Sequence, residues 1–177
     1  MDYDKSMLHN AFMRSRYSPC LRTKVGALAV VDGAVYATGY NHVPAGLPNC
    51  RNPKSSREYV CQRLNDDIKP LERYDLCSAI HAEVNLVLHA GGKFKPETIV
   101  YTTRTPCLNC FKILFEAGAD MLFSASPCGV GIEDSGVSNF CSKYYIPVIK
   151  CENKFTYLLK LYDIFFFDFR KARGLSL

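Results

Sequence analysis

The chain has 177 residues, 48% of them hydrophobic, which is enough for one globular domain with a sizeable core and leaves little room for a second. We find neither a secretory leader nor an apolar stretch long enough to cross a bilayer, so we expect a soluble, cytoplasmic protein with no membrane partner. The net charge of +5 is modest and forms no dense basic stripe, which argues against nucleic acid as a partner. The cysteine count is nine, an odd number, and favours thiolate and metal chemistry over a disulfide framework.

The first part of the chain predicts a helix followed by a hairpin. Residues 7–17 place apolar side chains on one helical face, and Ser18-Pro19 ends the pattern. The apolar runs at 25–31 and 34–40 flank Asp32-Gly33, which is a strong signal for two antiparallel strands. Residues 41–78 have no clear period and are rich in cysteine, so we expect an irregular insertion held by an internal staple or a short helix near 58–64.

Helices and strands alternate through the rest of the chain. The patterns predict helices at 79–90, 108–117 and 132–144, and strands at 98–102, 121–124 and 147–150. This alternation predicts a single α/β domain over residues 1–177, with a mixed sheet covered on both faces. The aromatic segment 155–171 predicts a final helix, whose phenylalanines would form either core or, as we favour, a subunit contact: Phe165, Phe166, Phe167 and Phe169.

Two short motifs in the second half of the chain carry the chemistry: His81-Ala82-Glu83 and Pro106-Cys107-Leu108-Asn109-Cys110. One imidazole and two thiolates are the three protein ligands of a catalytic zinc, which keeps its fourth position for water. Because these ligands neutralise the metal's charge, the water can still be acidified to a pKa of roughly 7. Two helix N-termini would favour the thiolates, and Glu83, two residues from His81, is placed as a proton carrier.

The pattern H-x-E…P-C-x-x-C is the signature of zinc deaminases that act on nucleobases, so the chain resembles the cytidine deaminase superfamily. Further segments resemble the deoxycytidylate (dCMP) deaminases in particular: residues 20–27, 39–41, 44–46 with Cys50, and 81–85. The resemblance implies a three-layer α/β/α sandwich with a central mixed five-stranded sheet. It also implies zinc-dependent deamination of dCMP to dUMP, activation by dCTP, inhibition by dTTP and a homo-oligomer that is often a hexamer.

The same resemblance assigns the substrate site. It makes Asn41 a substrate ligand, makes the segment with Thr23 and Lys24 a wall of the nucleotide site, and adds Ala82, Thr105 and Pro106. Lys93 and Arg104 are our candidates for the 5′-phosphate, because a cation there would gain charge-assisted hydrogen bonds. The loop that forms the allosteric nucleotide site in dCMP deaminases corresponds to Gly39, Tyr40, His42, Pro44 and Gly46, although many relatives have Gly in place of His42.

Four cysteines lie before the catalytic motif: Cys20, Cys50, Cys61 and Cys77. They could close one tetrahedral site around a structural zinc that ties the insertion to the core, or they could be free cysteines that pack as small apolar side chains. Relatives often hold a second zinc with equivalents of Cys20 and Cys50 completed by His and Glu. Ala79 stands here where an acid is expected, which leaves Cys61 and Cys77 as the substitutes.

Other functions fit the same motif. The chain could deaminate dCTP, free cytidine or deoxycytidine, or adenosine in tRNA. A different class is a zinc-stabilised binding module without catalysis. Glu83 argues against that module, because a decayed enzyme would lose its proton carrier first.

Overall fold

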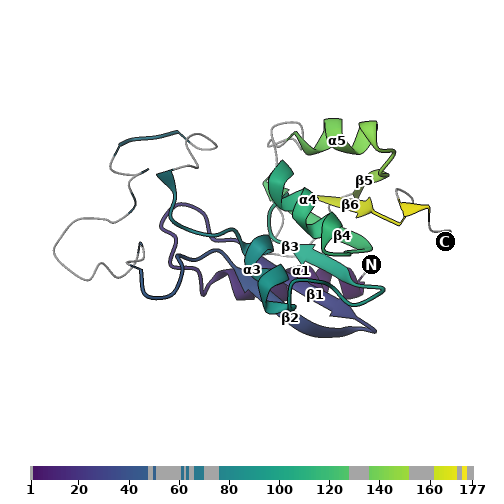
Figure 1. The fold of residues 1–177 in the computed structure, drawn as a ribbon, viewed down its shortest axis with the longest axis horizontal. Coiled ribbons are helices and arrows are strands. Elements are labelled where there is room, and N and C mark those ends of the chain that lie inside the picture. The colour runs from purple at the N-terminus through teal and green to yellow at the C-terminus, as the bar shows by residue number, and fades with distance from the viewer. Residues whose placement is uncertain are drawn as a thin grey trace.

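The computed structural model describes residues 2–47, 50, 61, 63, 66–69, 76–127, 136–151, 162–170 and 173–174. These residues form one mixed sheet of six strands in the order β2-β1-β3-β4-β6-β5 (Figure 1). The strands are β1 Gly26–Val31, β2 Ala34–Tyr40, β3 Ile99–Thr102, β4 Met121–Pro127, β5 Val148–Cys151 and β6 Tyr162–Asp168. The helices are α1 Asp2–Ser15, α3 Ala82–His89, α4 Leu108–Glu116 and α5 Val137–Lys143.

The predicted hairpin is confirmed. β1 and β2 pair antiparallel, with Val31 opposite Ala34 and Gly26 opposite Tyr40. Asp32 and Gly33 both have positive φ, 50° and 75°, which is the turn that matches the twist of two antiparallel strands. This pairing brings the end of β2 beside the start of β1.

The helices cover both faces of the sheet, as the alternation predicts. Successive strand residues point to opposite faces, so Val100 and Leu122 pack with Leu86 of α3 and Phe111 of α4. On the other face, a second apolar cluster joins α1 to the sheet through Leu8, Ala11, Leu28, Val30 and Tyr101. The Tyr101 hydroxyl also donates to Asp4 Oδ1 at 2.7 Å, and its burial raises the pKa of Tyr101. The three-layer α/β/α arrangement is therefore confirmed.

The C-terminal aromatic segment is a strand, so the prediction of a helix over 155–171 is wrong at residues 162–168. The five expected strands are all present, and β6 joins them as a sixth, antiparallel to both β4 and β5 (Figure 1). β6 lies inside the sheet between β4 and β5, and its apolar run at 164–167 has no alternation to distinguish a strand from a buried helix. Phe165, Phe167 and Phe169 are buried in the domain's own core, so the favoured subunit contact is wrong for these three. Phe166 is half-buried against Phe123, and a subunit contact there stays a prediction.

Part of the predicted insertion lies outside the described residues, including all of the expected helix near 58–64 except Cys61 and Arg63. The expected helix at 132–144 is present as α5, and residues 132–135 are outside the described part. Among the described residues, no helix combines the length and the apolar character that crossing a membrane requires.

Candidate metal centre

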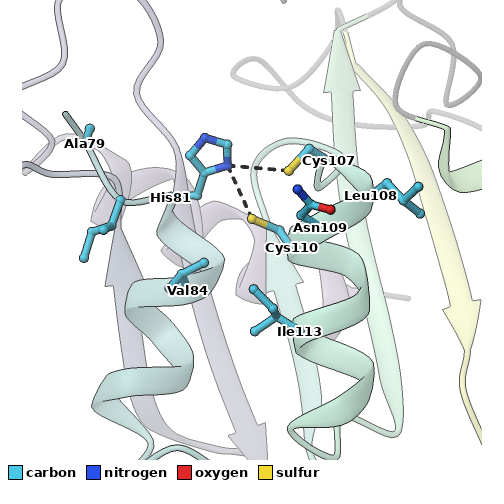
Figure 2. Close-up of a pocket in the computed structure, with 9 residues that line it drawn as sticks. Ala79, His81, Val84, Cys107, Leu108, Asn109, Cys110 and Ile113 are labelled. Atoms are coloured by element: carbon cyan, nitrogen blue, oxygen red, sulfur yellow. Dashed lines mark hydrogen bonds between the residues drawn. The ribbon is translucent and has the colours of Figure 1, made fainter. Parts of the chain in front are cut away.

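The two halves of the chemical motif meet at the N-termini of α3 and α4. His81 is the N-cap of α3 and Cys107 is the N-cap of α4, and both have extended backbone angles. Neither side chain caps its own helix, and both face the space between the two helices (Figure 2). Cys110 lies one turn into α4 and its sulfur is directed to the same point (Figure 2). α3 therefore starts three residues later than predicted, whereas α4 starts at Leu108 as predicted, and one ligand lies directly before each first turn.

The three donor atoms form a compact group, with Nδ1 of His81 3.7 Å from Sγ of Cys107 and 3.3 Å from Sγ of Cys110 (Figure 2). All three lie within 4.8 Å of one another. Zinc bonds of about 2.3 Å to sulfur and about 2.0 Å to nitrogen, at tetrahedral angles, require a nitrogen-to-sulfur separation of roughly 3.6 Å. The two observed nitrogen-to-sulfur separations bracket this value, so the three residues fit a zinc ion.

The protonation of the two thiols follows from their contact. Hydrogen bonds from Cys110 and then from His81 lower the pKa of Cys107 to about 4. The thiolate on Cys107 in turn raises the pKa of Cys110, and burial raises it further. Cys107 also raises the pKa of His81, by stabilising its protonated ring. The group thus carries one thiolate already, and a metal ion would displace the remaining protons.

Glu83 is placed for proton transfer. It lies in the first turn of α3 and is only 4% exposed. Burial raises the pKa of its carboxyl group, while the nearby His81 opposes that shift. A carboxyl with a raised pKa can both accept and return a proton near neutrality.

Close packing between β2 and the start of α3 fixes the position of His81. A Cβ on Gly39 would lie 2.3 Å from the carbonyl oxygen of Ala82 and 2.6 Å from the nitrogen of Leu86, so only glycine fits there. The Asn85 side-chain amide donates to the Tyr40 carbonyl at 3.0 Å. These contacts hold the helix against the strand and give Gly39, a predicted allosteric residue, a packing role.

A pocket of about 450 Å³ opens over the metal ligands, within the usual range for small-molecule sites. The metal ligands line the pocket together with apolar residues of α3, of α4 and of the segment before α3. The two helices face each other across the pocket (Figure 2). Its lining consists of Ala79, Ile80, His81, Val84, Cys107, Leu108, Asn109, Cys110 and Ile113.

The loops beside the metal centre are joined by hydrogen bonds. His42 and Ile80 form an isolated antiparallel bridge, with the Ile80 amide donating to the His42 carbonyl at 2.9 Å. The amide of Asn41 donates to the Thr23 carbonyl at 2.9 Å and its Oδ1 accepts from the Val25 amide at 2.8 Å. We call residues 22–25, 41–42 and 80–81 the rim. Both ends of the Asn41 side chain therefore bind the backbone of the rim, and its role as a substrate ligand stays a prediction.

The other predicted substrate residues divide into two groups. Thr23 and Lys24 are exposed on the rim, and buried Ala82 begins α3 beside the metal ligands. The loop before Cys107 contains Arg104, Thr105 and Pro106, with Thr105 Oγ1 accepting from Ser124 at 3.1 Å. Lys93 is exposed beyond the C-terminal end of α3, whereas the pocket is at the N-terminal end, so the structure does not bring Lys93 to the pocket.

The predicted allosteric loop presents aromatic rings. The ring centroid of Tyr40 is 5.4 Å from that of His42 and 6.2 Å from that of the exposed Tyr17. The Arg14 guanidinium lies 5.0 Å from both tyrosine rings. Pro44 and Gly46 are exposed, and Gly46 has φ of 89° with open space around it.

The four cysteines of the second cluster gather in one region. Burial and the neighbouring Cys61, Cys20 and Cys77 raise the pKa of Cys50 to about 11. Cys20 accepts from the Thr23 amide at 3.4 Å, which ties the cluster to the rim. Within the described part of the chain, however, His81, Cys107 and Cys110 are the group whose donors are close enough for a metal.

Arg63 is a residue that sequence reasoning missed. It is only 5% exposed, although it belongs to the irregular insertion. Its positive charge opposes protonation of His81, against the larger effect of Cys107. No periodicity or motif marks this residue, because its position depends on how the insertion folds back.

Comparisons with known proteins agree with the geometry of the site. The family model described as "Cytidine and deoxycytidylate deaminase zinc-binding region" matches residues 1–126. The deoxycytidylate deaminase of Mycobacterium phage D29 is 32% identical over 67% of this chain and 91% of its own length. That of Schizosaccharomyces pombe is 33% identical over 61% of this chain but only 32% of its own length. Among solved structures, the apo dCMP deaminase of cyanophage S-TIM5 matches with a TM-score of 0.49 and 23% identity, over 67% of this chain and 79% of that chain.

Proposed function

The chain belongs to the cytidine and deoxycytidylate deaminase family, and from this premise we propose that it deaminates dCMP hydrolytically to dUMP. The observation that carries the proposal is one site containing His81, Cys107 and Cys110 at zinc-binding separations, with the buried Glu83 beside them. This is the complete set of groups that the reaction requires. An inactive binding module would have no need for a buried carboxyl group at this position.

Each residue has a defined task. His81, Cys107 and Cys110 would hold the zinc, which when bound supplies an acidified water for attack on a polarised carbon. Glu83 takes a proton from the water and delivers it to N3 of the cytosine. It then passes a second proton to the departing amino group, so that water and dCMP give dUMP and ammonia.

The choice of dCMP over other substrates rests on the relatives. The phage D29 and Schizosaccharomyces pombe proteins are both deoxycytidylate deaminases, and the chain covers most of the phage protein. A dCMP deaminase of cyanophage S-TIM5 has been solved in complex with dCMP and dUMP. The alternatives are dCTP, the free nucleosides and tRNA adenosine.

Ammonia release from parallel incubations with dCMP, dCTP, deoxycytidine, cytidine and tRNA tests the proposal. We expect the highest kcat/KM with dCMP. Glu83→Gln should retain zinc and lower kcat by about 10²- to 10⁴-fold. A variant that keeps most of its turnover would contradict the role of Glu83, and a clear preference for another substrate would replace dCMP.

We also propose that dCTP activates the enzyme and dTTP inhibits it through the loop with Gly39, Tyr40, His42, Pro44 and Gly46. The neighbouring rings of Tyr40 and His42, which are tilted by 50° to each other, support this, because aromatic faces suit a nucleobase. Added dCTP and dTTP should change the rate in opposite directions in the wild type, and less so in His42→Ala. An equal response of both proteins would remove His42 from the effector site.

We further propose a structural zinc held by Cys20, Cys50, Cys61 and Cys77. Their convergence around Cys50 supports it. Elemental analysis should then give two zinc ions per chain, and one in Cys50→Ser. A zinc content of one ion per wild-type chain would show that the four cysteines are packed thiols without a metal.

By the same family membership, we propose a cytoplasmic homo-oligomer, for which the family resemblance implies a hexamer. Light scattering on the purified protein gives the mass directly. A monomer at micromolar concentration would exclude a stable assembly.

A further inference from the structure

The last residue of β3, Thr102, carries a hydroxyl group that is buried without a partner. The side chain is fully buried, and within the described part of the chain its Oγ1 atom makes no hydrogen bond. Burying a hydroxyl group in this way costs free energy, and buried polar groups are nearly always paired. Thr102 is therefore a hydrogen-bond donor that the fold itself does not use.

The pleat of β3 directs the Thr102 side chain toward α3 and α4. Successive strand residues point to opposite faces of the sheet. Val100 belongs to the core between the sheet and these two helices, whereas Tyr101 packs with α1 on the other face. Thr102, two residues after Val100, points to the same side as Val100. The cross-strand partner of Thr102 agrees, because Ala27 lies in the same core cluster as Val100.

The position of Thr102 along the strand matches that of Cys110 along α4. This helix connects β3 to the parallel strand β4, so it runs antiparallel to β3 and begins at the end where Thr102 lies. Leu114 of α4 is buried in the same core cluster as Val100. Cys110 is four residues before Leu114, which is about 6 Å toward the start of the helix. Thr102 is about 7 Å beyond Val100 in the same direction. The buried Cys110 therefore lies over the end of β3.

A second buried hydroxyl group lies beside Thr102 and already has a partner. Ser124 of β4 pairs with Thr102 across the parallel strands and is also fully buried. The Ser124 hydroxyl donates to Thr105 Oγ1 at 3.1 Å, in the loop that leads to Cys107. The carboxyl ends of parallel strands are where α/β sheets hold their ligands. Thr102 is thus the unused donor at the end of the sheet that faces the metal centre.

A zinc-bound cysteine is a suitable acceptor for this donor. Cysteine binds zinc as a thiolate, and hydrogen bonds to a charged acceptor are stronger than those between neutral groups. The ligands of a metal are commonly hydrogen-bonded by surrounding groups, which fix their orientation and tune the affinity for the metal. A hydroxyl group beneath Cys110 would serve this purpose.

We propose that Thr102 is a positioning residue of the metal centre, whose hydroxyl donates to Sγ of Cys110 when that cysteine binds zinc. The inference rests on the zinc centre of the proposed function and does not depend on dCMP as the substrate. It gives the buried hydroxyl a partner and makes the end of β3 a support for the metal ligands.

The test compares Thr102→Val and Thr102→Ser with the wild type. Valine resembles threonine in shape but lacks the hydroxyl, so Thr102→Val should weaken zinc binding by about 10- to 100-fold. After zinc removal, the same variant should melt roughly 2–6 °C above the wild type, because it no longer buries an unpaired hydroxyl. Thr102→Ser retains the donor and should bind zinc within about threefold of the wild type.

Thr98→Val is the matched control, because Thr98 lies just before the other end of β3 and its buried hydroxyl is already paired. This hydroxyl donates to the Lys95 carbonyl at 2.7 Å and lies 2.8 Å from the Tyr36 hydroxyl. Thr98→Val should lower the melting temperature and leave zinc binding unchanged. Competition with a chelator measures zinc affinity, and His81→Ala gives the zinc that is retained elsewhere in the chain.

The outcomes separate this inference from the proposed function. Weaker zinc binding in Thr102→Val, together with a higher melting temperature of its metal-free form, supports the inference. Unchanged zinc binding, a lower melting temperature or failure of Thr102→Val to fold would overturn it, as would equally weak zinc binding in Thr102→Ser. A lower kcat with unchanged zinc binding would assign the hydroxyl to Glu83 and would also overturn the bond to Cys110. A wild-type chain that retains no more zinc than His81→Ala would instead overturn the zinc centre and the proposed function.

Discussion

The two groups of cysteines in this chain differ in how closely their sulfur atoms are placed. Cys107 and Cys110 are three residues apart at the start of one helix, and with His81 they already form a group that fits zinc. Cys20 precedes β1 and Cys50, Cys61 and Cys77 come from distant points of the irregular insertion, and the four meet only as neighbours around Cys50. Helix N-termini therefore set ligand geometry before metal arrives, whereas the structural zinc proposed for the second cluster would itself have to fix the final geometry of its ligands.

Removing one ligand from each cysteine group tests the difference between the two groups most directly. His81→Ala should abolish turnover and lower the zinc content by about one ion per chain, because two thiolates alone do not complete the centre. Cys61→Ser should retain the catalytic zinc and measurable turnover but lower the melting temperature. Elemental analysis measures the zinc content of each variant, and ammonia release measures its turnover. Loss of the catalytic zinc in Cys61→Ser would show that the two groups depend on each other.

The pre-formed geometry of the catalytic group depends on Gly39. In Gly39→Ala the new methyl group would overlap the backbone of α3, so we expect a loss of about 1–3 kcal/mol in stability and at least tenfold in activity. Gly26→Ala is the matched variant, because its Cβ would lie 2.1 Å from the Ala11 carbonyl of α1 on the other face. Its stability should fall similarly with a smaller effect on activity. Equal activity losses would show that the clash acts through general destabilisation.

The thiolate of the metal-free centre can be detected chemically. After chelation at pH 6, iodoacetamide should modify Cys107, whose pKa is lowered to about 4 by Cys110 and His81. Cys141 should remain unmodified, because burial raises its pKa to about 12. Peptide mass spectrometry gives the modified sites, and added zinc should protect Cys107. Labelling of both residues at the same rate would mean that chelation had opened the core.

The smallest effect concerns the stability of the metal-free protein. Burial raises the pKa of Glu83 above its unfolded value, so its favourable contribution is complete at low pH and is lost as the pH rises through the folded pKa. The glutamine side chain in Glu83→Gln does not ionise, so this variant does not lose that stability as the pH rises. The variant should therefore be more stable than the wild type at pH 8, with a smaller difference at pH 4, as measured by urea unfolding. An equal difference in the free energy of unfolding at pH 4 and pH 8 would contradict the raised pKa of Glu83.

The sequence was sufficient for the parts of the fold that are encoded locally. The turn at Asp32-Gly33 and the two chemical motifs follow from residue types at short spacing, so the hairpin, the N-terminus of α4 and, within three residues, that of α3 could be predicted. β6 could not, because its continuous apolar run has no alternation that separates a strand from a buried helix. Lys93 was a candidate as a cation near the motif along the chain, and its place beyond the C-terminal end of α3 keeps it from the pocket. Arg63 was missed because only the folding of the insertion brings it inward.

The position of β6 has a consequence for biosynthesis. The family match ends at residue 126, within β4, and every zinc ligand of the catalytic centre lies before that point. Yet β4 has its outer hydrogen-bonding partner in β6, which leaves the ribosome after all the other strands. A nascent chain can thus carry its whole catalytic motif while one sheet edge is still open to pairing with another chain.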